Sequence, residues 1–434
     1  MGRKRADPTN GCGLLVSALA MTEAIAAVPR SIDPEVRPRV TLWLLGAAHA
    51  VNHAQAALLP LVYLAIVTEF GVSVAAIAFL TAIGNVASGL IQFTYAGITR
   101  LVSRRTILTI GGLVFGGGMA AQALAPNFGT FSIANVVSRV GGSPQHPVGN
   151  GLLAEQFPAH RRGLAISAHI AGGNIGTVAV PLLGAWLIAG IGWRWTVVLF
   201  GIPAMLIALA MYVLVRESGA DRAAALAYGS LRSALRAVIR DRNLLLVFAS
   251  AMLGGGGRGL GVLNIFVPLY LAVVIGLDTT TVALMYTVLV IGSVPAPIIA
   301  GWLSDRIGRK PLILGAYAGG ALALVVFVVA GSDVGLLWLG VILLSTFNFV
   351  ESPQLQALLS DISPPALRDA SFAVYFTLAF GVGSLWIAVY GAVIGTLGNA
   401  GGLPLTFAIM AGAFVAAGFA VLPVRLAAAR QSSG

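Results

Sequence analysis

Long apolar stretches, each bounded by charged residues or by Gly and Pro, recur along the whole chain. The hydrocarbon core of a bilayer is about 30 Å thick, so a helix needs roughly 20 apolar residues to cross it. The stretches are too long for barrel strands, which alternate over about ten residues. The pattern therefore predicts an all-α integral membrane protein whose twelve transmembrane helices lie at residues 40–67, 73–98, 105–125, 129–154, 163–190, 194–215, 244–275, 279–303, 309–331, 334–358, 369–396 and 403–424.

The basic residues are distributed unevenly between the two sides that these helices define. All but three of the 26 Lys and Arg residues fall in segments on one side, Arg194 falls on the other, and Arg139 and Arg258 lie within helices. Cytoplasmic segments of membrane proteins carry an excess of Lys and Arg. We therefore expect a multi-pass protein of the cytoplasmic (inner) membrane with both termini in the cytoplasm.

The composition excludes several classes of protein. Hydrophobic residues make up 58% of the chain and charged residues 9%, against about 25% charged residues in soluble domains. Such a chain needs a lipid bilayer around it, so the net charge of +11 reflects topology and no nucleic-acid partner is expected. The single cysteine, Cys12, excludes an intrachain disulfide. No nucleophile constellation or phosphate-binding loop stands out, so we expect no enzyme and no cofactor.

A long polar connection divides the predicted helices six and six. Short motifs recur in corresponding places of the two halves. Pro60-Leu61 of the first half corresponds to Pro268-Leu269 of the second, and Ser143-Pro144-Gln145 corresponds to Ser352-Pro353-Gln354. Transporters with repeated halves hold their site between them, so we expect two pseudo-symmetric six-helix bundles. The predicted parts are a cytoplasmic tail at residues 1–39, bundles at 40–215 and 244–425, an amphipathic cytoplasmic linker at 216–243 and a cytoplasmic tail at 426–434.

The first 39 residues allow a second interpretation. Basic residues from Arg3 to Arg5, followed by an apolar run at residues 13–20, are also typical of a secretory signal peptide. Cleavage after that run would place Arg30 and Arg37 outside, which favours a cytoplasmic tail.

One loop carries a specific signature. The segment Gly301-Trp-Leu-Ser-Asp305-Arg306-Ile-Gly308-Arg309-Lys310 resembles the loop motif G-x-x-x-D-R-x-G-R-K of the major facilitator superfamily. The corresponding loop of the first half has Leu101 in place of the Asp. The resemblance implies a carrier that works by alternating access and whose cytoplasmic side is gated by Gly301, Asp305, Arg306 and Arg309.

A finer resemblance is to the fosmidomycin-resistance-like exporters of that superfamily. It rests on His49-x-x-Asn52, on Gly142-Ser143-x-x-His146-Pro147 and on Gly172-Gly173-Asn174-Ile175-Gly176. The run Gly176-x-x-x-Val180-Pro181-x-x-Gly184-Ala185 is similar to the antiporter motif of the superfamily, with two Gly positions replaced. These resemblances favour export by antiport.

Three charged residues lie well inside the predicted helices: Arg139, Arg258 and Glu351. A charge at a helix centre costs about 2.5–3.5 kcal/mol on insertion scales and marks a functional site. The resemblance implies that the helices carrying these charges line a central cavity. A guanidinium stays charged, and its planar fork fits carboxylate or phosphonate oxygens, which predicts an anionic solute. The alternative for Arg139 is an internal ion pair with Glu351.

Polar side chains share faces of the same helices. The spacing of Arg139, His146 and Asn150 follows the helical repeat, and His49 to His53 span one turn. Interhelical hydrogen bonds, worth about 0.6 kcal/mol each, are the alternative for the asparagines. We predict a substrate-binding set formed by Arg139, Arg258, His146, Asn150, His49, Asn52, His53 and Asn348.

Proton coupling needs a group that titrates. Glu351 is the carboxylate placed in mid-membrane, and histidine titrates close to neutral pH. We therefore predict that Glu351 and His146 carry the coupled proton. His49 and His53 have the spacing of metal ligands, but no third ligand is evident in the sequence, so no metal site is expected.

Six glycines surround Arg258 between residues 254 and 261. Glycine weakens a helix, so this segment can bend or unwind. The alternative is close packing of small residues between helices.

These features together predict a proton-coupled secondary active transporter. It moves a small organic, anionic solute by alternating access as a monomer, driven by the proton gradient without a cofactor, and export by antiport is favoured. The alternatives are a proton-linked importer of a carboxylate-type solute and a non-transporting membrane receptor.

Overall fold

The computed structural model describes residues 36–425 except 382 and 384. Every regular element within these residues is a helix. The predicted tails at residues 1–39 and 426–434 lie almost entirely outside the described residues. The first described helix begins at Pro38, slightly before the predicted boundary, because proline fits the first turn of a helix, where its missing N–H is not needed.

The helices of the first half follow the predicted apolar stretches. Ser73 and Ser103 cap two of them, since each hydroxyl accepts a hydrogen bond from a backbone amide of the first turn at 3.2 Å. The longest helix turns at Gly192, whose φ of +77° is easy only for glycine. The elements are α2 (Pro38–Phe70), α3 (Val74–Leu101), α4 (Arg104–Ala123), α5 (Phe128–Gly142), η1 (Ser143–Gln145), α6 (Pro147–Gln156) and α7 (Ala159–Leu214).

The helices of the second half are more often interrupted. Gly398, with a φ of +68°, turns the last helix in the way that Gly192 turns α7. The elements are α10 (Arg242–Gly254), η2 (Gly259–Leu263), α11 (Asn264–Leu269), η3 (Tyr270–Val274), α12 (Thr279–Ile291), α13 (Pro295–Ile307), α14 (Arg309–Val329), α15 (Val334–Phe347), α16 (Glu351–Ile362), η4 (Pro365–Leu367), α17 (Arg368–Gly381) and α18 (Leu385–Val421).

Several predicted continuous helices are broken near their middle. The stretch at 129–154 contains a short 3-10 turn between α5 and α6, where Pro144 and Pro147 cannot donate backbone hydrogen bonds. The stretch at 244–275 leaves the α-helix at residues 255–258 and continues as the π-helix η2. These breaks fall beside the polar residues predicted to form the site.

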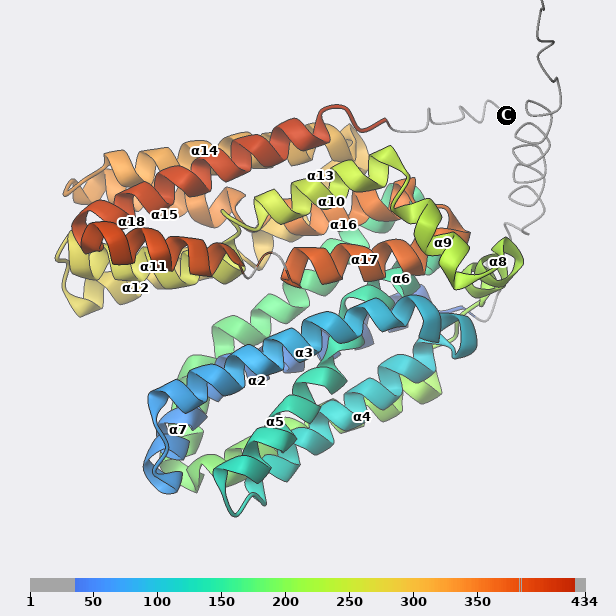
Figure 1. The fold of residues 1–434 in the computed structure, drawn as a ribbon, viewed down its shortest axis with the longest axis horizontal. Coiled ribbons are helices and arrows are strands. Elements are labelled where there is room, and N and C mark those ends of the chain that lie inside the picture. Colours follow the sequence, from blue (N-terminus) through green and yellow to red (C-terminus); the bar gives the residue numbers. More distant parts are fainter. Residues whose placement is uncertain (1–35, 382, 384, 426–434) are drawn as a thin grey trace, which may run out of the picture.

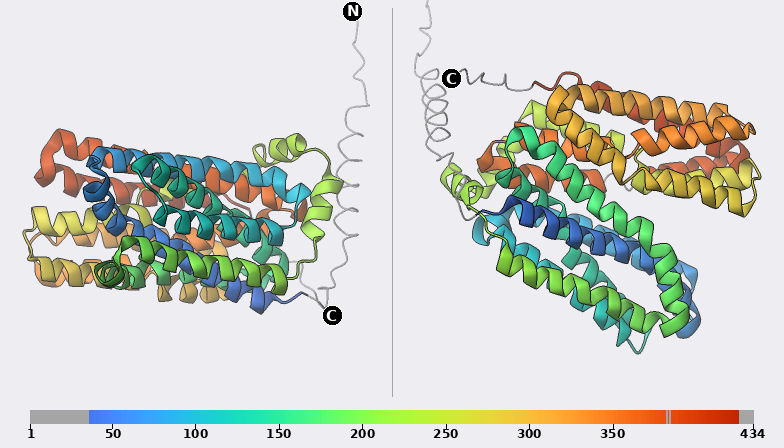
Figure 2. Two further views of the ribbon diagram at one scale, coloured as in Figure 1. Left: turned by 90° about the horizontal axis from the view of Figure 1, so that it is seen from below. Right: turned by 180° about the vertical axis from the view of Figure 1, so that it is seen from behind.

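The polar linker folds into two short helices, α8 (Ala220–Tyr228) and α9 (Leu231–Val238). They cover one end of the molecule, which we call the linker end (Figures 1 and 2). The amphipathic pattern predicted a helix from Leu231 onward, as α9 shows, but it did not predict α8.

The two halves form separate helical bundles. In Figure 1, α2 to α7 lie in one bundle and α10 to α18 in the other; the bundles approach each other towards the linker end and diverge at the opposite end. Across the boundary α7 packs against α13 and α16, and α17 packs against α3 and α6. The halves therefore meet most closely near the linker end.

The surface is suited to lipid. Eight helical stretches within the described residues are long and apolar enough to cross a membrane, and two shorter apolar helices accompany them. Large apolar side chains such as Trp43, Phe79 and Trp186 are exposed on the outside. The protein is thus an all-helical membrane protein, while the number of twelve crossings stays a prediction.

Candidate functional site

A cavity of about 440 Å³ lies between the two bundles. Its wall in the first half comes from α2, α3, α4, α5 and η1, and its wall in the second half from residues 255–262, α17 and α18. No Asp or Glu belongs to this wall among the described residues. The predicted binding residues that line the cavity are Asn52, His53, Arg139, His146 and Arg258.

Arg139 projects from α5 and is held by neutral side chains. Its Nε donates to Asn135 Oδ1 at 3.0 Å, and its two terminal nitrogens donate to Asn85 Oδ1 at 2.8 Å and to Tyr63 Oη at 3.2 Å. The alternative of an ion pair between Arg139 and Glu351 is therefore wrong. None of its three partners neutralises the guanidinium charge, which is consequently available to a ligand in the cavity.

Arg258 forms the ion pair instead. Its Nε donates to Glu351 Oε1 at 2.7 Å, and the Glu351 side chain is completely buried behind it. The Arg258 side chain stays 13% exposed and faces the cavity. Both residues lie where a helix is interrupted. Arg258 lies between the end of α10 and the start of η2, and Glu351 is the first residue of α16.

Asn348 fixes the unwound segment that carries Arg258. Its Nδ2 donates to the carbonyl oxygen of Gly257 at 2.9 Å, and its own carbonyl oxygen accepts from the amide of Gly259 at 2.8 Å. The glycine-rich segment is both unwound and closely packed. The α-helix is interrupted there, and a Cβ at Gly257 or Gly259 would lie within 2.6 Å of a phenylalanine ring. Asn348 itself is fully buried and does not line the cavity.

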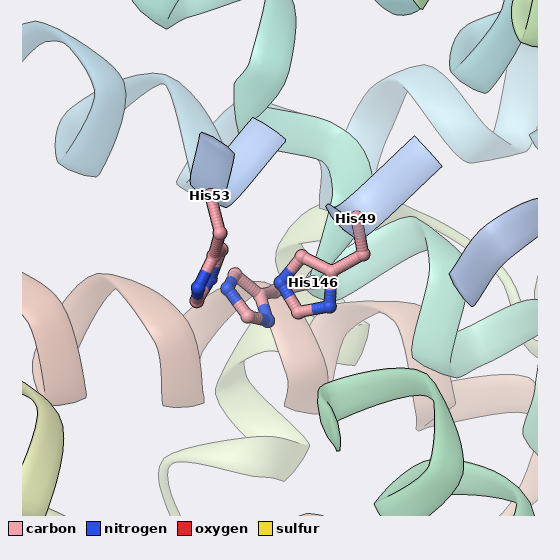
Figure 3. A group of neighbouring side chains, drawn as sticks. All are labelled: His49, His53 and His146. Carbon is pink, nitrogen blue, oxygen red and sulfur yellow. The ribbon is translucent and has the colours of Figure 1, made fainter. Parts of the chain in front are cut away.

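Four histidines gather on the side of the first half. The ring of His49 lies with its centroid 4.5 Å from those of His53 and His169, and 4.6 Å from that of His146. Figure 3 shows His49, His53 and His146 meeting. The His146 ring also stacks on Phe376 of α17, with 5.2 Å between centroids, so this cluster touches the opposite half.

Three predicted binding residues and the predicted proton carrier Glu351 lie behind the wall of the cavity. His49, Asn150, Asn348 and Glu351 are all fully buried and outside its lining. Asn150 Nδ2 donates to Gln356 Oε1 of the other half at 2.6 Å, so the alternative of an interhelical hydrogen bond describes this residue. These four side chains bind other parts of the protein and shape the cavity from outside.

The sequence prediction missed polar residues of α3. Asn85, Ser88 and Gln92 line the cavity at a spacing of three and four residues. That spacing places them on one helix face, so the same pattern search would have found them. Phe380 also lines the cavity, and no sequence signal distinguished it from other apolar residues.

The predicted gating residue Asp305 lies at the end of α13 and contacts the other half. Its two carboxylate oxygens accept from the backbone amides of Gly163 at 3.1 Å and Leu164 at 2.9 Å, in the second turn of α7. Asp305 also pairs with Arg309, whose Nε donates to Asp361 Oδ2 at 3.0 Å. Arg309 in turn donates to the carbonyl oxygen of Ala159 at 2.7 Å, so Asp305 and Arg309 together join α13 and α14 to α7 at the linker end.

Gly301 and Arg306 differ in their surroundings. A Cβ at Gly301 would lie 2.6 Å from the carbonyl oxygen of Gly163, so only glycine lets α13 approach α7 this closely. Arg306 is exposed and stacks over the Trp302 ring at 3.4 Å, and within the described residues it takes no part in the contacts between the halves. The expectation of a gating contact from Arg306 is therefore not met in this conformation.

A second set of contacts between the halves was not predicted. Arg104, at the start of α4 and 4% exposed, pairs with Asp221 of α8 at 3.0 Å, with Asp369 of α17 at 2.7 Å and with Glu155 of α6. Asp221 also pairs with Arg368 at 2.5 Å. Arg104 stands where the loop motif has a glycine, so the departure from the motif was the available signal.

These features define a class of protein: a polytopic membrane protein with two helical halves, a cavity between them that polar and apolar side chains line, and contacts that close one end. A sequence profile of the Major Facilitator Superfamily matches residues 45–388. The chain belongs to this superfamily, and it is a secondary transporter of small solutes and not an enzyme.

Distant relatives transport varied solutes. The cis,cis-muconate transport protein of Acinetobacter baylyi is 27% identical over 331 residues, which cover 73% of this chain and 76% of the relative. The fosmidomycin resistance protein of Escherichia coli is 25% identical over 383 residues, which cover 86% of this chain and 92% of the relative.

The fold is that of solved members of the superfamily. The E. coli fucose:proton symporter superposes with a TM-score of 0.73 at 14% identity, covering 88% of this chain and 97% of the symporter. A proton:xylose symporter gives a TM-score of 0.70 at 17% identity, covering 88% and 94%.

Proposed function

We propose that this transporter moves a small organic anion by alternating access and couples the movement to protons. One observation carries the proposal: Arg139 and Arg258 line the same cavity, and no acidic side chain lies in its described wall. A guanidinium binds a carboxylate through two parallel hydrogen bonds, which adds geometric specificity. An anion between the halves would therefore meet cations from both bundles.

The same proposal includes the topology. Twelve helices in two bundles, at residues 40–215 and 244–425, cross the cytoplasmic membrane, and the linker and both termini lie in the cytoplasm. The transporter works as a monomer. The distribution of Lys and Arg supports this orientation. In this orientation the closed linker end faces the cytoplasm, and the conformation is open to the outside.

Glu351 and His146 are proposed to carry the coupled proton. The ion pair holds Arg258 in one arrangement, so protonation of Glu351 would release its guanidinium for an anionic ligand. His146 contacts Phe376 and Phe380 of the opposite half, so a charge on its ring would alter a contact between the bundles.

Export by antiport is the favoured direction, because the chain resembles the fosmidomycin resistance protein over most of its length. A proton-linked importer of a carboxylate is the second candidate, and the similarity to the cis,cis-muconate transport protein favours it. The two candidates share the cavity and differ in the sign of coupling.

The test uses the purified chain in proteoliposomes with radiolabelled cis,cis-muconate and fosmidomycin. Antiport predicts accumulation when the vesicle lumen is acidic, symport predicts accumulation when the outside is acidic, and a protonophore should abolish either. Flux that ignores the pH gradient would remove the coupling. Absence of counterflow for these and a panel of other organic anions would contradict anion transport.

A further inference from the structure

Three histidines near the cavity wall lie close together in space, and the sequence alone did not predict this cluster. His49 and His53 lie one turn apart on α2, and His146 joins them from the junction of η1 and α6. One ring nitrogen of each residue lies within 4.8 Å of the corresponding nitrogens of the other two. The missing third ligand of the metal-type spacing at His49 and His53 is therefore present in space (Figure 3).

The neighbours of His49 fix which nitrogen is free. His49 Nδ1 donates to the carbonyl oxygen of His169 at 2.9 Å, so Nε2 of the neutral ring carries the lone pair. Nε2 is buried and has no hydrogen-bond partner in the described residues. A donor nitrogen held by a backbone carbonyl is the usual outer-shell arrangement of a metal-binding histidine.

The surroundings of the His53 and His146 rings also bear on which of their nitrogens can bind a ligand. His53 Nδ1 is hydrogen-bonded to Thr177 Oγ1 at 3.1 Å. When the ring donates its proton to that hydroxyl, Nε2 carries the lone pair. His146 Nδ1 is buried without a hydrogen-bond partner among the described residues. Two of the three rings thus present a buried nitrogen that no protein group satisfies, which is costly unless a ligand binds it.

The size of the set suits a small ion. A zinc ion binds imidazole nitrogens at about 2.0–2.1 Å, which places the nitrogens of a tetrahedral site roughly 3.4 Å apart. The three nitrogens lie within 4.8 Å of one another, so binding one ion would require them to approach by about 1.4 Å at most. His53 and His146 line the cavity, so the fourth coordination position would face it.

We propose that His49, His53 and His146 bind a divalent late transition-metal ion, Zn²⁺ in the first instance, in a site with one open position towards the cavity. Neutral imidazole binds zinc, nickel and copper well, whereas calcium and magnesium prefer oxygen ligands. Three histidines with an open fourth position form a ligand set typical of accessible zinc sites. The inference concerns binding of the ion and does not depend on the proposed solute. An ion bound to the free nitrogen of His146 would exclude the coupled proton from that nitrogen, so the ion and the proton compete there.

The test titrates Co²⁺, a spectroscopic substitute for Zn²⁺, into the purified full-length chain carrying a tag free of histidine. We expect one Co²⁺ per chain, visible d–d bands of a tetrahedral site, and their loss when Zn²⁺ is added. His146→Ala and His53→Gln should each weaken binding by at least the 10–100-fold that loss of an outer-shell partner costs. His160→Ala is the matched control, since this exposed histidine lies outside the cluster.

X-ray absorption at the zinc edge of the wild-type protein gives a readout that needs no variant. Three imidazole ligands support the site. The absence of stoichiometric binding, or an ion held by fewer than two imidazoles, overturns it, as does a loss of binding in His160→Ala alone. Thermal unfolding of each variant separates lost binding from lost folding.

Discussion

Among the described residues, the hydrogen-bond partners of the Arg139 side chain at the cavity wall are all neutral. Its guanidinium donates to Asn135, Asn85 and Tyr63, all neutral, whereas Arg258 is paired with Glu351. An incoming anion would thus meet one free charge from the first half and one charge from the second half that it must share with Glu351.

Replacement of Arg139 by Gln tests this difference. The variant keeps hydrogen-bonding capacity but loses the charge, and a hydrogen bond to a charged group contributes about 1.5–3 kcal/mol. We therefore expect the KM for a transported anion to rise about 10–100-fold in proteoliposomes. Arg232→Ala, at an exposed position of α9, serves as the control. An unchanged KM in Arg139→Gln would contradict a role in binding.

Glu351→Gln addresses the coupling. The amide cannot be deprotonated, so the variant mimics the protonated state and leaves Arg258 without its ion-pair partner. We expect exchange of labelled for unlabelled solute to continue, while accumulation driven by a pH gradient falls to the level of a protonophore-treated sample. Accumulation equal to that of the wild type would exclude Glu351 as the proton carrier.

At this scale the sequence predicted which residues are unusual but not which of them meet. The helical repeat placed Arg139 and Asn150 on one face of a predicted helix, yet the turn at η1 separates them: Arg139 faces the cavity and Asn150 is buried against Gln356. The partner of Glu351 could not be derived either, because the register between two helices depends on packing across the whole bundle.

Helix interruptions position the site. The turn at residues 255–258 aims Arg258 at Glu351. The break between α15 and α16 places Asn348 where it binds the backbone on both sides of Arg258. Apolar run lengths predicted where helices lie, since burial in lipid demands them. They did not predict the breaks, because a freed backbone group is satisfied by partners far away in the sequence.

The close contact between α13 and α7 depends on the absence of a side chain at Gly301, so one added methyl group should disturb it. Gly301→Ala would place a Cβ 2.6 Å from the carbonyl oxygen of Gly163. Overpacking typically costs about 1–3 kcal/mol, so we expect the linker end to open more often. Gly315→Ala on α14 is the control, because a Cβ there meets nothing within 4 Å.

Spin labels report the opening directly. Leu101→Cys and Ile307→Cys, both exposed at the linker end on opposite halves, carry the labels in a Cys12→Ser background. A longer distance population should grow in Gly301→Ala and stay at the wild-type level in Gly315→Ala. Identical distance distributions in all three proteins would show that the close approach does not hold this end shut.

On the scale of the whole molecule, the two halves are joined at the linker end by two different sets of contacts. One is built around Asp305 of the loop motif and backbone amides of α7. The other is built around Arg104, Asp221 and Asp369. The repeat predicted two similar halves, but the change at Leu101 in the first loop removed the symmetric contact and a different one occupies its place.

Asp221→Asn tests the second set. Asp221 is 3% exposed and pairs with both Arg104 and Arg368. Removing one partner of a buried pair costs roughly 3–5 kcal/mol, and we expect the lower end because Arg104 keeps other carboxylates. The melting temperature of the purified protein should fall, and the distance between the linker-end labels should lengthen.

The control for this variant is Asp241→Asn, at the exposed cap of α10, where Asn is an equally good capping residue. A melting temperature that falls equally in both variants, or a label distance unchanged in Asp221→Asn, would show that the Arg104 contacts do not close the molecule.

The position of Asp221 on α8 has a consequence for the segment between the halves. A plain tether would only keep the bundles together, and its length or sequence would be of little importance. Here the tether supplies a carboxylate that bridges arginines of both bundles. Cutting or shortening the chain beside α8 would therefore shift the balance between open and closed forms even if both bundles remained intact and adjacent.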